Sequence, residues 1–196
     1  VTIHDLIFIR YPHLFSTIDR KIYLKKFKSA CERADKIIAI SQQTKQDIID
    51  FLEIPESKIT VVYQGCNNIF QKPIAESKKE ETLKKHNIPT EYLLNVGSIE
   101  ERKNLLTLLQ ALKELPNQKL VVIGNGKSYK IKCLRYIKEH NLSGRVMFLS
   151  NLTLEEMAVI YQSAQLMIYP SIFEGFGIPI LESLFSKTPV ITSKGG

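Results

Sequence analysis

Between residues 92 and 192 the sequence alternates short apolar runs with amphipathic segments, and this alternation limits the fold strongly. The apolar runs read as buried strands at residues 92–96, 120–123, 146–149, 166–169 and 190–192. Leucines recur at helical spacing from Leu105 to Leu115, and a second helical pattern begins at Leu154. Strands separated by helices require crossover connections. We therefore predict an α/β fold with a parallel, doubly wound sheet, and ligands at the carboxyl ends of its strands.

The first part of the chain has shorter and less regular elements. Residues 1–9 are β-branched and apolar around His4 and read as one strand, with further strands at 36–40 and 59–63. Ser41 is expected to cap a helix that ends before Pro55. A helix over residues 19–36 is expected to direct Ile22, Tyr23, Phe27 and Ala30 to one side, among several lysines. Residues 67–92 are polar and predict a linker with a short exposed helix.

Composition excludes some classes of protein. The 196 residues are 44% hydrophobic and 24% charged, as in soluble globular proteins, and no apolar run is long enough to span a membrane. The three cysteines are scattered, which fits reduced thiols better than disulfides or zinc. A net charge of +7 favours an anionic partner. No nucleic-acid-binding signature is present, so we expect no nucleic-acid partner.

The string EGFGIPILE, residues 174–182, carries the densest chemical signal. Gly175 and Gly177 allow close approach of a ligand to the backbone, and a helix is expected to open near Ile178 or Pro179. The N–H groups at a helix start attract phosphate, whereas the carboxylates of Glu174 and Glu182 can accept hydrogen bonds from sugar hydroxyls. By themselves these residues fit equally well a tight turn with Glu182 complementing the helix dipole.

The full string closely resembles the signature of retaining glycosyltransferases of the GT-B fold, family 4, in which two glutamates have this spacing. The resemblance implies that Glu174 lies beside the donor sugar and that Glu182 binds the ribose of the nucleotide. It also implies that the intervening backbone amides, those of Gly175, Phe176, Gly177 and Ile178, face the sugar and the diphosphate.

Two further segments resemble the same family. VGSIEERKN, residues 96–104, matches its donor-phosphate motif, with Gly97 allowing close approach and Arg102 and Lys103 neutralising the diphosphate. An isolated Arg–Lys pair is more often surface decoration. Residues 2–6, TIHDL, resemble the end of the family's N-terminal domain, and this assigns to His4 a place near the donor sugar. Residues 146–151 resemble the segment that receives the nucleobase.

Other sites are disfavoured. A dinucleotide fingerprint around Gly124 and Gly126 would need a third glycine where Tyr129 stands, so these glycines are read as a turn lining the cleft. The last aspartate is Asp50 and there is no D-x-D pair, so we expect no metal and no cofactor besides the donor substrate, a UDP- or GDP-sugar.

The resemblance implies two Rossmann-like domains, both incomplete here. Residues 1–68 would close the N-terminal, acceptor-side domain, 69–91 would be a linker, and 92–196 would form most of the nucleotide-sugar-binding domain. The expected function is metal-independent sugar transfer, with retention, to a glycan or lipid-linked acceptor. A GT-B sugar-nucleotide epimerase or phosphorylase, or a non-catalytic binding fragment, is the alternative. We expect a cytoplasmic location. A lysine-rich helix of this kind is usually a solvated face, and the alternative is peripheral contact of the helix with anionic lipid at the cytoplasmic face of a membrane.

Overall fold

The computed structural model describes residues 1–194. The contacts within the chain divide it into two compact units. The first comprises residues 1–65 together with 174–176, and the second comprises residues 66–173 and 177–196. The domain boundaries expected at residues 68 and 91 stay predictions. No helix in the described part of the chain combines the length and the apolar character needed to cross a membrane.

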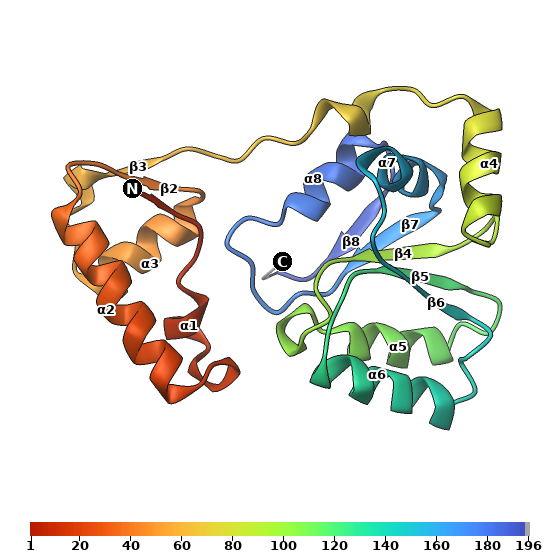
Figure 1. Cartoon of the computed structure of the whole chain (residues 1–196), viewed down its shortest axis with the longest axis horizontal. Helices are drawn as coiled ribbons and strands as arrows, with labels where there is room; N and C mark the ends of the chain where they lie inside the picture. The colour runs from red at the N-terminus through yellow and green to blue at the C-terminus, as the bar shows by residue number, and fades with distance from the viewer. Residues whose placement is uncertain (195–196) are drawn as a thin grey trace. The chain divides into compact units, whose positions relative to one another are not determined.

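The second unit contains a five-stranded parallel sheet in the order β6-β5-β4-β7-β8 (Figure 1). Its strands are β4 (Leu93–Val96), β5 (Leu120–Ile123), β6 (Val146–Leu149), β7 (Leu166–Tyr169) and β8 (Val190–Thr192). The predicted strands are thus confirmed, four with the expected bounds and the first beginning one residue later. This is the doubly wound α/β arrangement expected from the alternation of strands and helices.

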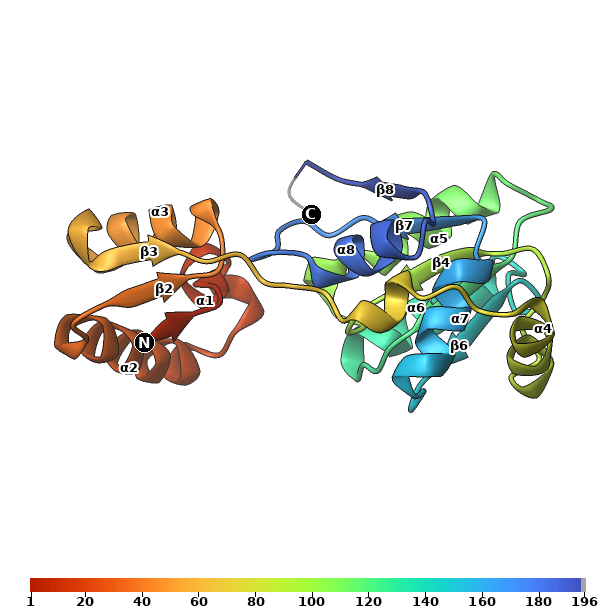
Figure 2. The ribbon, with the colours of Figure 1, turned by 90° about the horizontal axis from the view of Figure 1, so that it is seen from above.

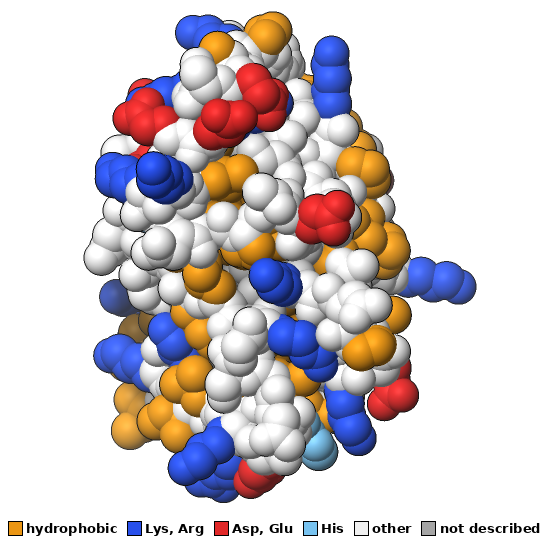
Figure 3. All heavy atoms as spheres, turned by 90° about the vertical axis from the view of Figure 1, so that its right-hand side faces the viewer, with side chains coloured by type: hydrophobic (Ala, Val, Ile, Leu, Met, Phe, Trp, Pro, Cys, Tyr) orange, Lys and Arg blue, Asp and Glu red, His pale blue; other side chains and the backbone are white. Residues whose placement is uncertain are grey.

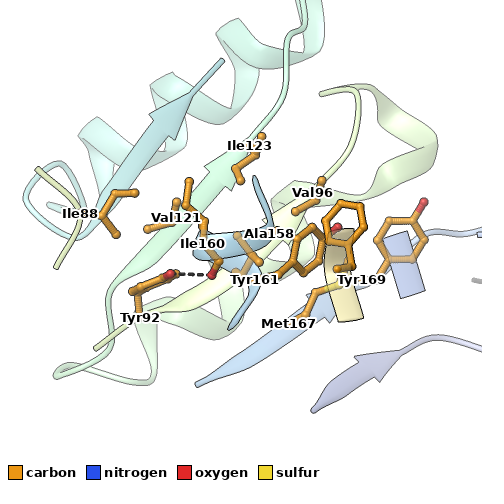
Figure 4. Close-up of a cluster of buried hydrophobic side chains, with 12 residues drawn as sticks. Ile88, Tyr92, Val96, Val121, Ile123, Ala158, Ile160, Tyr161, Met167 and Tyr169 are labelled. Atoms are coloured by element: carbon orange, nitrogen blue, oxygen red, sulfur yellow. Dashed lines mark hydrogen bonds between the residues drawn. The ribbon is translucent and has the colours of Figure 1, made fainter. Parts of the chain in front are cut away.

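Helices cover both faces of this sheet, as expected for a sheet whose inner strand β5 is apolar and buried on both sides. On one face, α5 (Leu105–Lys113) and α6 (Ser128–Glu139) contribute Leu108, Leu109, Leu112 and Cys133 to a buried cluster. On the other face, α7 (Leu154–Ser163) brings Ala158, Ile160 and Tyr161 against the strands, as Figure 4 shows. The helix α8 (Ile178–Phe185) lies on the same side as α7 (Figures 1 and 2).

The chain reverses its winding direction between β4 and β7. From β4 the sheet grows outward through β5 and β6, and the chain then returns to place β7 on the opposite side of β4. The loops after β4 and β7 therefore leave the sheet at its carboxyl edge with helices on opposite faces. Such a switch point is where doubly wound sheets bind ligands.

The first unit contains a three-stranded parallel sheet, β1-β2-β3. Its elements are β1 (Thr2–Ile3), α1 (Ile7–Arg10), the 3-10 helix η1 (Pro12–Leu14), α2 (Thr17–Arg33), β2 (Ile37–Ala39), α3 (Gln42–Leu52), the 3-10 helix η2 (Glu56–Lys58) and β3 (Ile59–Val61). Ser41 caps α3 as predicted, since its hydroxyl accepts the N–H of Thr44 at 3.0 Å.

The single strand expected over residues 1–9 is wrong beyond Ile3. Asp5 Oδ1 accepts the N–H of Ile7 at 3.1 Å, and the chain then turns into the short helix α1. Leu6, Ile7 and Phe8 are buried one after another, a pattern that a strand with one covered face does not produce. A local turn in which the Asp5 side chain bonds the backbone two residues on therefore ends the strand, despite the β-branched composition.

Residues 67–92, expected to be a linker with a short exposed helix, are partly buried in the second unit. It holds the 3-10 helix η3 (Asn68–Gln71) and α4 (Glu76–Lys85). Phe70 is 1% exposed and Ile88 is 6% exposed, and both belong to the core cluster that contains Tyr92. On the face that carries α4, cationic and acidic side chains lie among one another (Figure 3). Within α4 itself, Lys78 and Glu81 form an ion pair at 2.9 Å. The two buried side chains, spaced far apart in a polar segment, gave no periodic signal.

Candidate functional site

The carboxyl ends of β4 and β7 hold most of the residues that the sequence singled out. After β4 come Gly97 and the 3-10 helix η4 (Glu101–Lys103), which precedes α5. After β7 come the EGFGIPILE segment and α8. Because β4 and β7 are parallel neighbours, both loops leave the same edge of the sheet. The fold therefore brings the second unit's share of the two motifs together at the switch point.

Lys103 reaches from η4 to the end of β7. Its ammonium Nζ donates to the hydroxyl of Tyr169 at 2.7 Å and lies 5.0 Å from the centre of the Tyr169 ring. Its stem passes along Gly97, because a Cβ built on Gly97 would lie 3.7 Å from Lys103 Cδ. Gly97 has φ +145°, so the missing side chain serves the backbone conformation, whereas a Cβ there would make only ordinary van der Waals contact with the lysine.

Arg102 ties the two loops to each other. Its guanidinium donates to the Phe173 carbonyl at 2.7 Å and to Glu100 Oε1 at 2.6 Å. Its own carbonyl accepts the N–H of Ile172 at 2.9 Å. With only 13% of its side chain exposed, Arg102 is built into the loop structure as well as adding positive charge beside it.

The start of α8 has the form that the sequence predicted. Gly177 adopts the left-handed conformation with φ +87°, and Ile178 and Pro179 begin the helix. The Gly177 carbonyl accepts the N–H of Ile180 at 3.0 Å. Since glycine has no side chain with which to cap the helix, the first N–H groups of α8 and its positive dipole end are suited to an anion.

Glu182 lies in α8 and pairs with α7. Its Oε2 accepts the hydroxyl hydrogen of Tyr161 at 2.7 Å. Burial raises the pKa of Glu182, and the bond from Tyr161 opposes that rise. Burial also raises the pKa of the Cys66 thiol, and the nearby Glu182 charge adds to the effect. A buried tyrosine thus holds this carboxylate in one orientation.

Gly124 and Gly126 serve the packing of two loops. A Cβ on Gly124 would lie 1.9 Å from the Gly97 carbonyl oxygen, and one on Gly126 would lie 2.2 Å from that of Ile99. The Ile99 N–H donates to the Asn125 carbonyl at 2.8 Å, so the β5–α6 loop supports the loop that carries Lys103. The glycines predicted as a turn thus hold two backbones in close contact.

Four of the predicted site residues group with the first unit. These are His4, Glu174, Gly175 and Phe176. Within that unit Gly175 lies against His4, since a Cβ on Gly175 would be 2.4 Å from the His4 carbonyl oxygen. The His4 carbonyl also accepts the hydroxyl of Thr44 at 3.1 Å. The roles assigned to all of the site residues stay predictions.

Tyrosines are the polar residues that sequence reasoning missed. Tyr169 contacts Lys103, and Tyr161 contacts Glu182. The hydroxyl of Tyr129 accepts the N–H of Leu106, at the start of α5, at 3.0 Å. Tyr169 and Tyr161 are fully buried aromatics in apolar segments, so their spacing indicated only core positions. The one available signal was chemical, because a buried tyrosine hydroxyl needs a partner.

The described residues contain no group of three or more His, Cys, Asp or Glu side chains placed to hold a metal ion. Arg102, Lys103 and the start of α8 place positive charge at the switch point.

Comparison with protein families gives two matches. The family profile described as glycosyl transferases group 1 matches residues 78–196. A second profile, glycosyltransferase family 4, matches residues 1–68.

Individual relatives agree with these profiles. The chain is 27% identical to an O-antigen chain mannosyltransferase of Salmonella typhimurium over 195 residues, covering 98% of this chain and 51% of the relative. It is 29% identical to a serotype-specific mannosyltransferase of Escherichia coli over 191 residues, covering 92% of this chain and 23% of the relative. The chain therefore spans about half, or less, of the length of these curated relatives.

Solved structures share the fold. HepE from Anabaena, in complex with UDP and glucose, superposes with a TM-score of 0.83 at 20% identity, covering 100% of this chain and 52% of HepE. Sucrose-phosphate synthase from Thermosynechococcus elongatus gives a TM-score of 0.81 at 25% identity, covering 100% of this chain and 50% of the synthase.

Proposed function

Because the chain belongs to the glycosyl transferases group 1 family, we propose that the whole protein transfers a sugar from a nucleoside-diphosphate sugar to a glycan or lipid-linked acceptor. The observation that carries the proposal is the meeting, at one switch point, of the Lys103 loop and the start of α8. Both features favour an anion such as a phosphate group. The mannosyltransferase names of the curated relatives support the reaction class.

The donor is a UDP- or GDP-sugar. Its diphosphate would meet Lys103, Arg102 and the backbone of Gly177 and Ile178, while the ribose would meet Glu182. HepE is described in complex with UDP-glucose, and its fold matches this chain, which supports a donor of this kind. Neutralising the departing diphosphate with fixed cations and a helix dipole lowers the barrier, because these groups act where negative charge develops.

The reaction retains the anomeric configuration and needs no metal. The bond between the anomeric carbon and the phosphate oxygen breaks, the diphosphate keeps the electron pair, and the acceptor oxygen bonds to the same face of the sugar. The acceptor proton passes to the departing phosphate. Glu174 would stabilise positive charge at the anomeric carbon, and His4 would contact the donor sugar.

A phosphorylase or a sugar-nucleotide epimerase of the same fold is less favoured, because the named relatives are transferases. A reaction with the full-length protein distinguishes the transferase, the phosphorylase and the epimerase. We expect UDP or GDP release to depend on acceptor, and the product anomer, read by NMR, to match the donor. Consumption of donor without acceptor, or free phosphate as the nucleophile, would contradict transfer, and an inverted product would contradict retention.

We also infer peripheral contact with the cytoplasmic face of a membrane through α2. Ile18 is 73% exposed, Ile22 is 45% exposed and Leu24 is 42% exposed. Lys21, Lys25 and Lys26 are exposed among them. The apolar side expected from the sequence is thus only partly covered, with Cys31 as the buried residue of α2. Exposed apolar side chains among lysines favour an anionic lipid surface.

A further inference from the structure

We propose that Tyr169 is a positioning residue, which holds the Lys103 ammonium in the diphosphate subsite. The inference rests on the proposed function, because it assigns a role within the same site. It concerns a residue that neither the motifs nor the family resemblance singles out. Tyr169 is the last residue of β7, directly before the loop that leads to α8.

The geometry links Tyr169 to the functional lysine. The 2.7 Å bond from Lys103 Nζ to the Tyr169 hydroxyl joins the β4–α5 loop to the end of β7. The ammonium is much closer to the hydroxyl than to the ring centre, which is 5.0 Å away, so the hydroxyl makes the closer contact. An ammonium has three N–H donors, and a bond to Tyr169 is compatible with one to a phosphate oxygen.

Tyr169 itself is held firmly. It is 1% exposed, and it pairs with Thr192 of β8, whose Oγ1 donates to the Tyr169 carbonyl at 3.1 Å. The preceding carbonyl, that of Ile168, accepts Nδ2 of the buried Asn95 from β4 at 2.8 Å. The hydroxyl is therefore a fixed acceptor at the carboxyl edge of the sheet, and it does not depend on a flexible loop.

A fixed acceptor matters because lysine is flexible. Its four-carbon stem has many rotamers, and a ligand that must order the stem binds more weakly for that reason. A lysine already directed toward the subsite loses less entropy when it meets a phosphate. The hydroxyl should therefore strengthen binding of the diphosphate and leave contacts to the nucleoside unchanged.

The test compares four forms of the chain by calorimetry, namely wild type, Tyr169→Phe, Lys103→Ala and the double variant. Each is titrated with UDP and GDP, and with uridine and guanosine. We expect Tyr169→Phe to weaken diphosphate binding about three- to tenfold, the range for one hydrogen bond, without changing nucleoside binding. We also expect the double variant to bind no more weakly than Lys103→Ala, because the hydroxyl acts through the lysine.

Tyr92→Phe is the matched control. Tyr92 is equally buried, and its hydroxyl donates to the Ile160 carbonyl at 2.6 Å, as Figure 4 shows. Tyr92 directly precedes β4, so it lies at the amino ends of the strands, whereas Tyr169 lies at their carboxyl ends. This variant loses a comparable hydrogen bond and should lower the melting temperature without any selective loss of diphosphate affinity.

The outcomes separate the two proposals. If wild type binds neither UDP nor GDP, the proposed function fails. If wild type binds and Tyr169→Phe binds equally well or more tightly, or if its loss adds to that of Lys103→Ala, the positioning role is overturned and the proposed function stands. Equal losses for nucleoside and diphosphate would likewise show a structural role only.

Discussion

Arg102 is joined to Phe173 by a hydrogen bond from the guanidinium to the Phe173 carbonyl, at 2.7 Å. Together with the bond from the Ile172 N–H to the Arg102 carbonyl, it fastens the loop after β7 to the loop after β4. A residue expected only to neutralise phosphate therefore also sets the shape of the site. Arg102 therefore has a structural role in addition to its predicted role toward phosphate.

Arg102→Lys should separate the two roles of the arginine. Lysine keeps the positive charge but lacks the planar fork that reaches Phe173 and Glu100 together. We expect the melting temperature and the UDP affinity to fall nearly as far in Arg102→Lys as in Arg102→Ala, with affinity losses of about tenfold or more. Thermal melting and calorimetry measure both. Near-normal behaviour of Arg102→Lys would show that charge alone matters.

Glu182→Gln should weaken nucleotide binding about tenfold, and equally for UDP and UDP-glucose, because the carboxylate is assigned to the ribose. Burial raises the pKa of Glu182, so the ionised form costs folding stability above the ordinary carboxyl range. Removing that charge should leave the melting temperature at neutral pH unchanged or higher. Affinity and melting curves test this together. A loss confined to UDP-glucose would contradict the ribose role.

Glu156 should control part of the acid sensitivity. Its carboxylate contacts Lys85 at 2.7 Å, the Thr153 N–H at 2.9 Å and His86 at 2.8 Å, and these partners lower its pKa to about 2. The pKa is thus lower in the folded state than the unfolded value of about 4.3. The stabilisation is therefore complete above that value and is lost as the pH falls toward 2.

Melting temperatures between pH 6 and pH 2.5 measure the effect. Glu156→Gln keeps the side-chain length needed for the capping box at Thr153 but removes the titration. We expect a shallower decline with acid than in wild type. The matched control is Glu155→Gln, in the same turn and exposed, which should decline as wild type does. Parallel curves for Glu156→Gln and wild type would refute the assignment.

Reversal of charge on α2 should abolish most lipid binding. Lys25→Glu with Lys26→Glu removes cations beside Ile22, and attraction of roughly 1 kcal/mol per lysine predicts a loss of more than about tenfold on phosphatidylglycerol vesicles. Vesicle co-sedimentation of the chain measures it. Lys113→Glu with Lys119→Glu changes net charge equally on the second unit and should bind as wild type. Equal losses in the two pairs would mean that only net charge counts.

The strands of the second unit could be predicted because each is a short apolar run between helical patterns. The start of α8 could be predicted because Gly177 and Pro179 restrict the backbone in known ways. The hydrogen bonds between elements could not. Nothing in the spacing of Tyr169 or Tyr161 shows that their hydroxyls meet Lys103 and Glu182, because such contacts depend on tertiary packing.

The same limit applies to single residues that override their surroundings. The Asp5 side chain bonds the Ile7 N–H just before the helix α1, in a stretch that is otherwise apolar. Phe70, in a polar segment, packs into a core whose other residues come from later in the sequence, such as Tyr161. Gly124 read as half of a phosphate signature, yet a Cβ built on it would lie 1.9 Å from the Gly97 carbonyl oxygen. Pairwise contacts of this kind leave no period in the sequence, and only the fold reveals them.

We propose that the second unit binds a nucleoside diphosphate through cationic side chains and a helix start, without a metal. Calorimetric titration of the chain with UDP and GDP, in EDTA and then with added Mg²⁺, measures this binding, with uridine and guanosine as controls. We predict binding of at least one diphosphate that is unchanged by EDTA and about tenfold or more tighter than that of its nucleoside. Binding that disappears in EDTA would contradict metal-independent binding, and equal affinity for nucleoside and diphosphate would contradict a diphosphate subsite.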